Sequence, residues 1–212
     1  MLLVPLLGSH AEAANLVVNG GFEAGTTGFT SGYSYVPPTP QTSCYGEGTY
    51  TVGSNPFACH NLWASFSPHT GNGMMIVNGA STSGVNVWQE SGITVSPHTN
   101  YLFSAWIAST YAESPADLTF SVNGSEIGVP FVASATTGLW QEFSASWNSG
   151  SNTSAQLDIV NLNTAAGGND FALDDIGLSP VPEPASLIVM GTALLGVGWT
   201  QRNKLRARSH PA

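Results

Sequence analysis

Short runs of alternating apolar and polar residues fill most of the chain between residues 73 and 178. In 101–107 every second residue is apolar, and the same period of two recurs in 118–122. This period is that of a β-strand with one buried face. Asn123-Gly124 follows the second run directly and is a strong signal for a tight hairpin turn. The pattern predicts strands at 16–18, 32–36, 74–78, 85–90, 101–109, 118–122, 127–132, 139–147, 155–161 and 171–178.

No convincing helical period occurs before residue 181. Residues 24–58 are rich in Gly, Pro, Ser and Thr, with scattered tyrosines, and we interpret them as a long irregular excursion. Eight or more short strands at regular spacing are typical of two packed sheets. The predicted fold class is therefore all-β, a jelly-roll β-sandwich over residues 15–180, which is long enough to bury a core.

The pattern changes after residue 180. Residues 185–200 are uncharged and mostly apolar on every face of a helix, so amphipathic packing is not their purpose. An apolar run closed by basic residues is a membrane signal, although sixteen helical residues span only about 24 Å of a bilayer core of about 30 Å. Two prolines precede the run, and all four lysines and arginines of the chain follow it. These flanking residues are Pro182, Glu183, Pro184, Arg202, Lys204, Arg206 and Arg208.

This combination resembles the PEP-CTERM sorting signal of Gram-negative bacteria. The resemblance covers 181–212: Val-Pro-Glu-Pro-Ala-Ser-Leu, then a hydrophobic helix and a basic end. It implies that the helix holds the protein in the membrane until an exosortase-type membrane protease removes the tail. It also implies delivery to the cell envelope, the outer surface or the extracellular matrix. A buried C-terminal helix of a soluble domain is the alternative, which fits poorly with the prolines and the basic cluster.

The first 14 residues also resemble a targeting segment. An apolar run is followed by small residues at Ala11 and Ala13, as at the end of a secretory signal peptide, although a charged n-region is missing. We predict a signal-peptide remnant over 1–14, with an ordinary disordered N-terminus as the alternative. The expected organisation is then 1–14 signal remnant, 15–180 β-sandwich and 181–212 sorting signal.

The predicted domain is acidic and has no cationic side chain of the lysine or arginine type. Residues 15–180 contain eleven Asp and Glu residues and no Lys or Arg. A surface without such cations cannot neutralise phosphates, which excludes nucleic acid as a partner. Nucleotide binding through a lysine or arginine clamp is excluded for the same reason.

Cys44 and Cys59 are the only cysteines. In an exported chain, two cysteines this close are expected to form a disulfide bond. A metal site that includes His60 is the alternative, but it lacks the second pair of ligands that structural zinc sites use.

Carboxylates lie near both ends of the predicted domain. Asn-Gly-Gly-Phe-Glu ends at Glu23, and Asp-Phe-Ala-Leu-Asp-Asp covers 170–175. If the first and last strands are neighbours, Glu23 and Asp174 meet. Clustered carboxylates without lysine or arginine need another cation, and calcium prefers oxygen ligands. Solvated turn carboxylates are the alternative.

These two motifs, with Val-Trp-Gln-Glu at 87–90 and Leu-Trp-Gln-Glu-Phe at 139–143, resemble calcium-containing, galactose-binding-like β-sandwiches. That group includes many carbohydrate-binding modules, and the resemblance covers most of 15–178. It implies a structural Ca²⁺ held by Glu23 and Asp174, with carbonyl groups of 69–73 as weaker contributors. Asp175 is expected to point to the other face of its strand, because neighbours alternate. The candidate metal residues are Glu23, Asp174, Asp175 and Asp170.

Aromatic residues in loops are the candidates for carbohydrate binding, because aromatic faces stack on sugar rings. The aromatic residues in or beside loops are Tyr33, Tyr35, Tyr45, Tyr50, Trp63 and Tyr111, and the site residues proposed from them are Tyr45, Trp63 and Tyr111. The tryptophans in strand patterns are instead expected in the core, where a large ring buries most area. These are Trp88, Trp106, Trp140 and Trp147.

No catalytic motif stands out. The chain has no Gly-x-Ser-x-Gly elbow and no His-Glu-x-x-His spacing, and its only adjacent acid pair, Asp174 and Asp175, is expected to diverge. We predict a non-catalytic surface or matrix protein, associated with exopolysaccharide or biofilm, with carbohydrate binding as an open option. The alternatives are a secreted glycan-active enzyme with a site built from distant residues, and a membrane-anchored surface protein whose tail is not removed.

Overall fold

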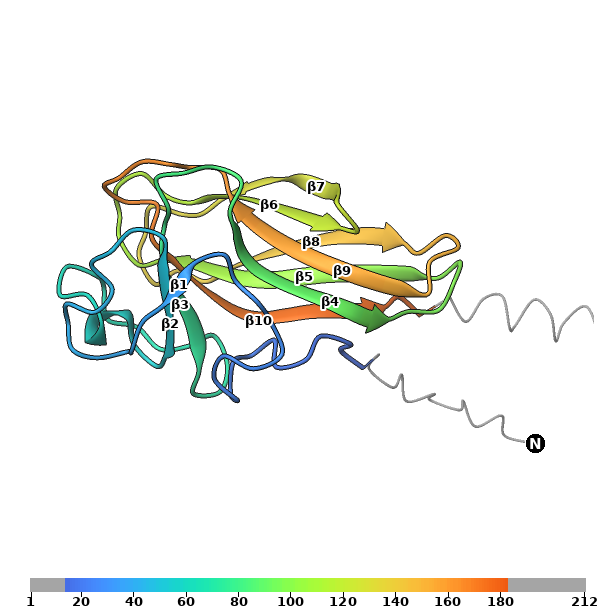
Figure 1. Ribbon diagram of the computed structural model, residues 1–212, viewed down its shortest axis with the longest axis horizontal. Helices are drawn as coiled ribbons and strands as arrows, with labels where there is room; N and C mark the ends of the chain where they lie inside the picture. Colours follow the sequence, from blue (N-terminus) through green and yellow to red (C-terminus); the bar gives the residue numbers. More distant parts are fainter. Residues whose placement is uncertain (1–13, 183–212) are drawn as a thin grey trace, which may run out of the picture. The chain divides into compact units, whose positions relative to one another are not determined.

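The computed structural model describes residues 14–182 and confirms an all-β sandwich (Figure 1). The chain divides into two units, Met1–Pro180 and Val181–Ala212, and only residues 181 and 182 of the second are described. Within 14–182 there are ten strands and one short 3-10 helix, η1. They are β1 Ser34–Tyr35, β2 Thr49–Gly53, η1 Pro56–Ala58, β3 Met74–Asn78, β4 Asn86–Thr94, β5 Asn100–Ser109, β6 Asp117–Val122, β7 Ser125–Val132, β8 Gln141–Asn148, β9 Ser154–Asn161 and β10 Phe171–Pro180.

The strands form two sheets that face each other. One sheet has six strands in the order β1-β2-β3-β10-β5-β8, and the other has four in the order β4-β9-β6-β7. All neighbouring strands are antiparallel except β1 and β2, which are parallel. The last strand, β10, lies near the centre of the six-stranded sheet, between β3 and β5. The segment at the start of the domain, residues 15–18, is not a strand of either sheet.

The alternating runs bury one face each, as the period of two predicts. In β5 and β6 every second residue, the alternating set Tyr101, Phe103, Ala105, Ile107, Leu118, Phe120 and Val122, is buried in the main core. Phe120 stacks on Phe143 of β8 with ring centroids 3.6 Å apart, and Phe103 meets Phe120 edge to face. Trp88 lies fully in this core as expected, whereas Trp106, Trp140 and Trp147 are only half-buried. Aromatic pairs between the two sheets thus fix their spacing.

The eight strands predicted from residue 74 onward are all present, and each overlaps its predicted range. The predicted strand at 16–18 is wrong. Leu16 N–H donates to the Leu178 carbonyl of β10, but the Asn15 side chain bonds to Ile176 and Leu178 of the same strand. Because a side chain takes the place of backbone partners here, no ladder forms and the segment runs beside β10 as a turn.

Two further differences fall in the irregular excursion. The strand expected at 32–36 is reduced to β1, and β2 at Thr49–Gly53 was not predicted. Tyr50 of β2 faces the main core while Thr51 is fully buried on the other side. A strand buried on both faces by a mixture of apolar and polar residues carries no clear period of two.

The chain between β1 and β3, which contains most of the excursion, covers the outer face of the six-stranded sheet and builds a second, smaller core there. In β3, Met75 and Val77 face the main core, whereas Met74 and Ile76 face outward into the second cluster. The buried members of this second core are Cys44, Cys59, Trp63, Met74, Ile76 and Ala172, and Val36, Phe66, Tyr111 and Trp140 pack against it. The sandwich therefore has three layers at this end.

The predicted disulfide is present at the centre of the second core. Cys44 and Cys59 are bonded to each other, are fully buried, and have Cα atoms 5.2 Å apart. Cys44 N–H also donates to the Cys59 carbonyl at 3.1 Å. The bond thus joins the two limbs of the excursion directly above β3.

The predictions for both ends of the chain lie largely outside the described residues. These are the signal remnant up to residue 13, the hydrophobic run 185–200, and the sorting-signal residues from Glu183 onward. Across residues 14–182, no helix has the length and apolar character that crossing a membrane requires.

Replacing both Cys44 and Cys59 by Ala should lower the free energy of unfolding by about 3 kcal/mol, the loop-closure estimate for a bridge of this separation. The measurement is urea unfolding of wild type and the double variant, with reduced wild type as control. Equal stability of oxidised wild type and the double variant would contradict a stabilising bridge.

Candidate functional site

A pocket opens beside the second core, at the end of the domain where β10 begins. Its cavity measures about 260 Å³. Five separate segments wall it: the loop between β1 and β2, the turn after η1, the end of β3, the loop after β5 and the loop before β10. The lining residues are Tyr45, Glu47, His60, Leu62, Trp63, Asn78, Tyr111, Glu113, Ala166, Gly167, Gly168 and Asp170.

Three rings form a continuous aromatic wall on one side of this pocket. His60 lies between Tyr45 and Trp63, with ring centroids 4.6 Å from each, and it stacks nearly parallel on Trp63. Burial lowers the pKa of His60, so the imidazole is neutral at pH 7. Tyr45 is 48% exposed and presents its ring to solvent, while Trp63 is only 3% exposed and supports the wall from behind.

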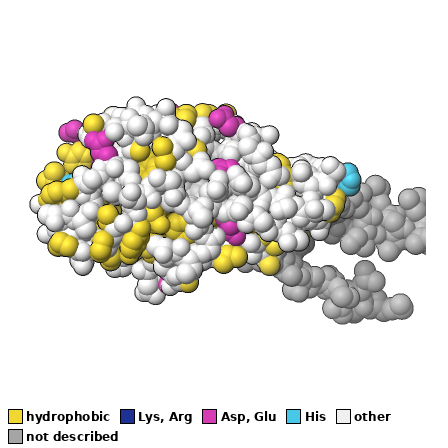
Figure 2. All heavy atoms as spheres, viewed as in Figure 1, with side chains coloured by type: hydrophobic (Ala, Val, Ile, Leu, Met, Phe, Trp, Pro, Cys, Tyr) yellow, Lys and Arg dark blue, Asp and Glu magenta, His cyan; other side chains and the backbone are white. Residues whose placement is uncertain are grey.

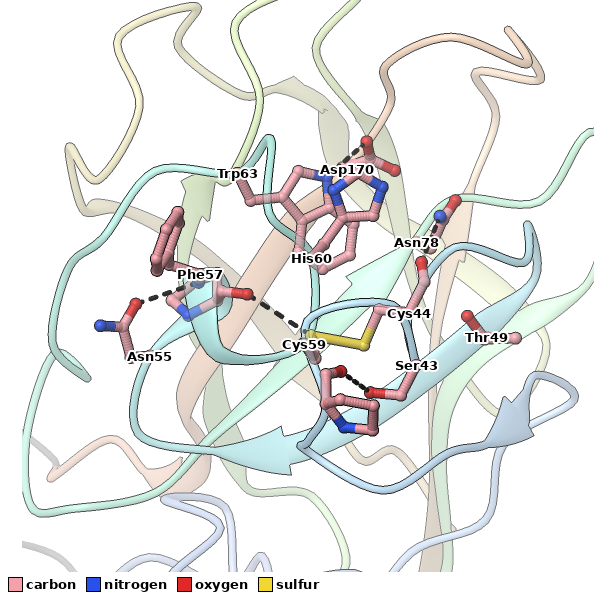
Figure 3. The surroundings of a disulfide bond; sticks show 12 residues. Ser43, Cys44, Thr49, Asn55, Phe57, Cys59, His60, Trp63, Asn78 and Asp170 are labelled. Atoms are coloured by element: carbon pink, nitrogen blue, oxygen red, sulfur yellow. Dashed lines mark hydrogen bonds between the residues drawn. A yellow bond between two sulfur atoms is a disulfide. The ribbon is translucent and has the colours of Figure 1, made fainter.

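The disulfide holds this wall in place. Tyr45 follows Cys44 and His60 follows Cys59, so each half-cystine carries one ring of the wall as its chain neighbour. Figure 3 shows His60 and Trp63 together beside the sulfur atoms, with Asp170 at the indole nitrogen. Because the two rings are attached on either side of a covalent link, they need no ligand to hold them together.

Asp170 forms the base of the pocket. It is 6% exposed, and it accepts hydrogen bonds from Trp63 Nε1 at 3.1 Å and from the Gly79 backbone N–H at 3.2 Å. Burial, with a smaller contribution from the negative charge of Glu47, raises the pKa of Asp170 to about 7. Although sequence analysis grouped Asp170 with the candidate metal residues, the structure gives it different neighbours from Glu23 and Asp174.

Glu23 and Asp174 both bond to the loop 69–73, each at its own residues. The backbone N–H groups of Asn72 and Gly73 donate to Glu23 Oε1 at 2.6 and 2.8 Å. Those of His69 and Thr70 donate to Asp174 Oδ2 at 2.8 and 3.1 Å. The loop 69–73 named from the sequence thus joins the two carboxylates, although through its N–H groups.

The electrostatics of these two carboxylates differ. Asp174 has no exposed surface, and burial raises its pKa to about 6 despite its three backbone hydrogen bonds. Glu23 is exposed, and the hydrogen bonds from Asn72 and Gly73 lower its pKa. The buried acid is therefore the one that most needs a positive neighbour.

The expectation that Asp175 points away from Asp174 is wrong. The ladder between β10 and β5 shifts register after Asp174, and Asp175 has a positive φ of 46°. This bulge turns Asp175 toward the same loop, where it bonds to His69 Nδ1 at 2.6 Å and accepts from Thr70 Oγ1 at 2.7 Å. His69 in turn stacks on Trp106 of β5 at 3.8 Å.

Three carboxylates thus gather at loop 69–73, and the domain has no lysine or arginine to neutralise them. Among the residues of 14–182, no group of three or more His, Cys, Asp or Glu side chains is arranged to hold a metal ion. Carboxylate and carbonyl oxygens nevertheless match the ligand chemistry of calcium. The three carboxylates have the charge and the donor atoms that a hard cation takes, although in this structure they accept hydrogen bonds from N–H and hydroxyl groups of the loop.

The three aromatic residues proposed for carbohydrate binding, Tyr45, Trp63 and Tyr111, line one pocket. Their roles differ, because Tyr45 offers an exposed face whereas Trp63 is buried against Asp170. Sequence reasoning missed the acidic and polar members of the site. The missed residues are Glu47, Asn78 and Glu113. The one signal in the sequence for this site was a position next to a disulfide-bonded cysteine, and only Tyr45 and His60 have it.

The tail and the domain each resemble known proteins. A model described as the PEP-CTERM protein-sorting motif matches residues 180–203. The chain therefore carries this export motif, which implies processing by an exosortase-type system and sorting to the cell surface. A comparison with curated proteins gave no significant sequence match.

Solved structures confirm the sandwich class. The xylan-binding CBM22-1 domain of Paenibacillus barcinonensis Xyn10C has a TM-score of 0.52 at 16% identity, covering 83% of this chain and 100% of that one. The Stig cyclase Fisc from Fischerella sp. TAU has a TM-score of 0.57 at 9% identity, covering 82% and 100%. Tailspike protein 4 of bacteriophage CBA120 has a TM-score of 0.52 at 11% identity, covering 79% and 21%. The fold is that of carbohydrate-binding modules, and cyclases share it.

The buried Asp170 should make the domain more stable at mildly acidic pH. Its pKa is raised to about 7, so the folded chain keeps a proton between about pH 4 and 7 that the unfolded chain releases. Lowering the pH from 7.5 to 5 should therefore add about 2 kcal/mol to the free energy of unfolding through this group.

Asp170→Asn should remove that part of the pH dependence, measured by urea unfolding followed by tryptophan fluorescence at several pH values. The raised pKa of Asp174 acts in the same direction and remains in the variant. Parallel stability curves for wild type and variant would show that Asp170 is ionised in the folded protein at pH 5.

Proposed function

We propose that this is an exported, non-catalytic surface or matrix protein that binds carbohydrate in the pocket formed by Tyr45, His60, Trp63 and Tyr111. The observation that carries the proposal is the aromatic wall held by the disulfide bond beside an open, polar cavity. Ligand pockets typically combine aromatic surface with a few placed polar groups. The carbohydrate-binding-module fold agrees with this assignment.

The chemistry of the pocket suits a sugar ring. The exposed face of Tyr45 offers an apolar surface for the C–H face of a pyranose. Glu47 and Glu113 offer carboxylate oxygens that accept hydrogen bonds from sugar hydroxyls, and such bonds to charged groups are the stronger kind. Since the wall is already assembled, binding costs little ordering of side chains.

The proposed location is the outer surface or extracellular matrix of a Gram-negative bacterium, in exopolysaccharide or biofilm material. Removal of the tail by an exosortase-type protease would release the sandwich there. The PEP-CTERM motif supports the sorting step, and the pocket supports an attachment to polysaccharide after it.

A non-catalytic role is supported by how Asp170 is held. Both of its oxygens accept hydrogen bonds from groups of the fold itself, Trp63 and Gly79. The Asp170 carboxyl therefore holds the Trp63 indole and the end of β3 in place, which is a structural role in the aromatic wall. The secreted glycan-active enzyme remains the rival, and cleavage products from a bound oligosaccharide would establish it.

Tyr45→Ala and Tyr111→Ala should each weaken binding of the secreted protein to its glycan, which an array of neutral, amino and acidic oligosaccharides would identify. Loss of one aromatic contact of about 1–2 kcal/mol corresponds to roughly a five- to thirtyfold loss of affinity. Tyr35→Ala is the matched control, because Tyr35 is 53% exposed and lies outside the pocket. Equal affinity of all three variants would place the binding elsewhere.

We also propose a structural calcium ion at Glu23, Asp174 and loop 69–73. The fully buried Asp174 carboxylate without a lysine or arginine neighbour supports it, as does the convergence of Asp175 on the same loop. A bound Ca²⁺ would supply positive charge where the first segment of the domain meets its last strand.

Calcium should raise the melting temperature of the wild type by about 5 °C or more at a large excess over its dissociation constant. Glu23→Gln should lose most of this shift without loss of the fold, because Glu23 is exposed. Glu126→Gln, on the β7 hairpin, should keep it. The site is excluded when wild-type melts in calcium and in chelator coincide.

A further inference from the structure

We propose that the pocket selects glycans that carry free amino groups, as in glucosamine residues, over neutral and acidic glycans. This deepens the proposed function and rests on it. The inference comes from the combination of acidic residues, hydrogen-bond acceptors and aromatic faces that line one cavity.

The acids surround the cavity from three different segments. Glu47 belongs to the turn before β2, Glu113 follows β5, and Asp170 precedes β10. Glu47 and Glu113 are exposed, whereas Asp170 lies at the base. No lysine or arginine occurs in 14–182 to pair with any of them. On the face that Figure 2 shows, acidic side chains but no lysine or arginine are seen among the described residues.

A buried amide adds a second acceptor to the same cavity. Asn78 lines the pocket and is 7% exposed. Its Nδ2 donates to the Cys44 carbonyl at 2.7 Å, which turns the amide so that the nitrogen is occupied. Within the part of the chain that the structure describes, Asn78 Oδ1 accepts no hydrogen bond. This fixed oxygen, like the exposed carboxylates of Glu47 and Glu113, is free to accept a donor from the ligand.

An ammonium group satisfies all of these features at once. It carries three N–H donors and no acceptor. Its positive charge would also pair with the pocket acids, which have no lysine or arginine partner in residues 14–182. Exposed tyrosine faces attract cations as well, and Tyr45 and Tyr111 both line the cavity. A hydroxyl group would satisfy the acceptors but not the charge.

An acidic sugar meets the opposite situation. A uronate would add its carboxylate to those of Glu47 and Glu113 in a cavity without lysine or arginine, where like charges repel. His60 does not relieve this, because burial lowers its pKa and keeps the ring neutral at pH 7. The same residues that favour an ammonium therefore exclude uronic acids.

The test is calorimetric titration of the full secreted chain at pH 6.5 and low salt with four oligosaccharides of equal length. The probes are oligomers of glucosamine, N-acetylglucosamine, glucose and galacturonic acid. We expect the glucosamine oligomer to bind about tenfold more tightly than the N-acetylated one, as for one partly screened ion pair, and the galacturonate not to bind. Added salt should reduce the preference.

Variants locate the source of the preference. Glu47→Gln and Glu113→Gln should each reduce the ratio of glucosamine affinity to neutral-oligomer affinity about threefold or more, because glucosamine loses an ion pair whereas a neutral oligomer loses only the charge on a hydrogen-bond acceptor. Glu126→Gln, an exposed acid on the β7 hairpin outside the pocket, should change nothing.

The outcomes separate the two proposals. Equal binding of the glucosamine and neutral oligomers overturns the amino-sugar inference and leaves carbohydrate binding intact. A preference for glucosamine that survives both pocket variants also overturns it, since the attraction then comes from the net charge of the whole domain. Failure of all four oligomers to bind overturns the carbohydrate-binding proposal and this inference together.

Discussion

The need to cover the outer face of the six-stranded sheet governs the rest of this structure. Met74 and Ile76 of β3 and Ala172 of β10 point away from the main core and would otherwise be exposed. The chain between β1 and β3, residues 36–73, lies over them and is called the cover here, and the Cys44–Cys59 bond closes it. Burial of apolar surface on the second face repays the ordering of a segment that is poor in regular structure.

Both candidate sites follow from this cover. Its first part carries Tyr45, His60 and Trp63, which become one wall of the pocket because the disulfide ties their chain neighbours together. Its last part is the loop 69–73, which meets Asp174 on the same outer face of β10. One covering segment thus brings an aromatic wall to one position on β10 and a set of backbone donors to another.

The main core was predictable because its strands carry a clean period of two, as in 101–107 and 118–122. The cover was not predictable, because apolar and polar residues are buried on both of its sides and no period of two results. Tyr50 and Thr51, for example, are neighbours in β2 and both are buried. For the same reason Trp63 was predicted as an exposed loop residue and is instead buried. The bulge at Asp175 also has no sequence period, since it depends on a single left-handed residue that the loop bonds to.

The absence of lysine and arginine from the domain explains how its buried acids are held. Asp174 is bound by backbone N–H groups, Asp170 by an N–H group and an indole, and Asp158 by the amides of Asn86, Gln89 and Gln156. Such neutral donors hold an acid in position without cancelling its charge. A fold built this way keeps a negative field at its cavities.

The matched sorting motif begins at Pro180, the last residue of β10. Removal of the tail near residues 182–185 would therefore take away the chain's lysines and arginines and leave every strand of the sandwich complete.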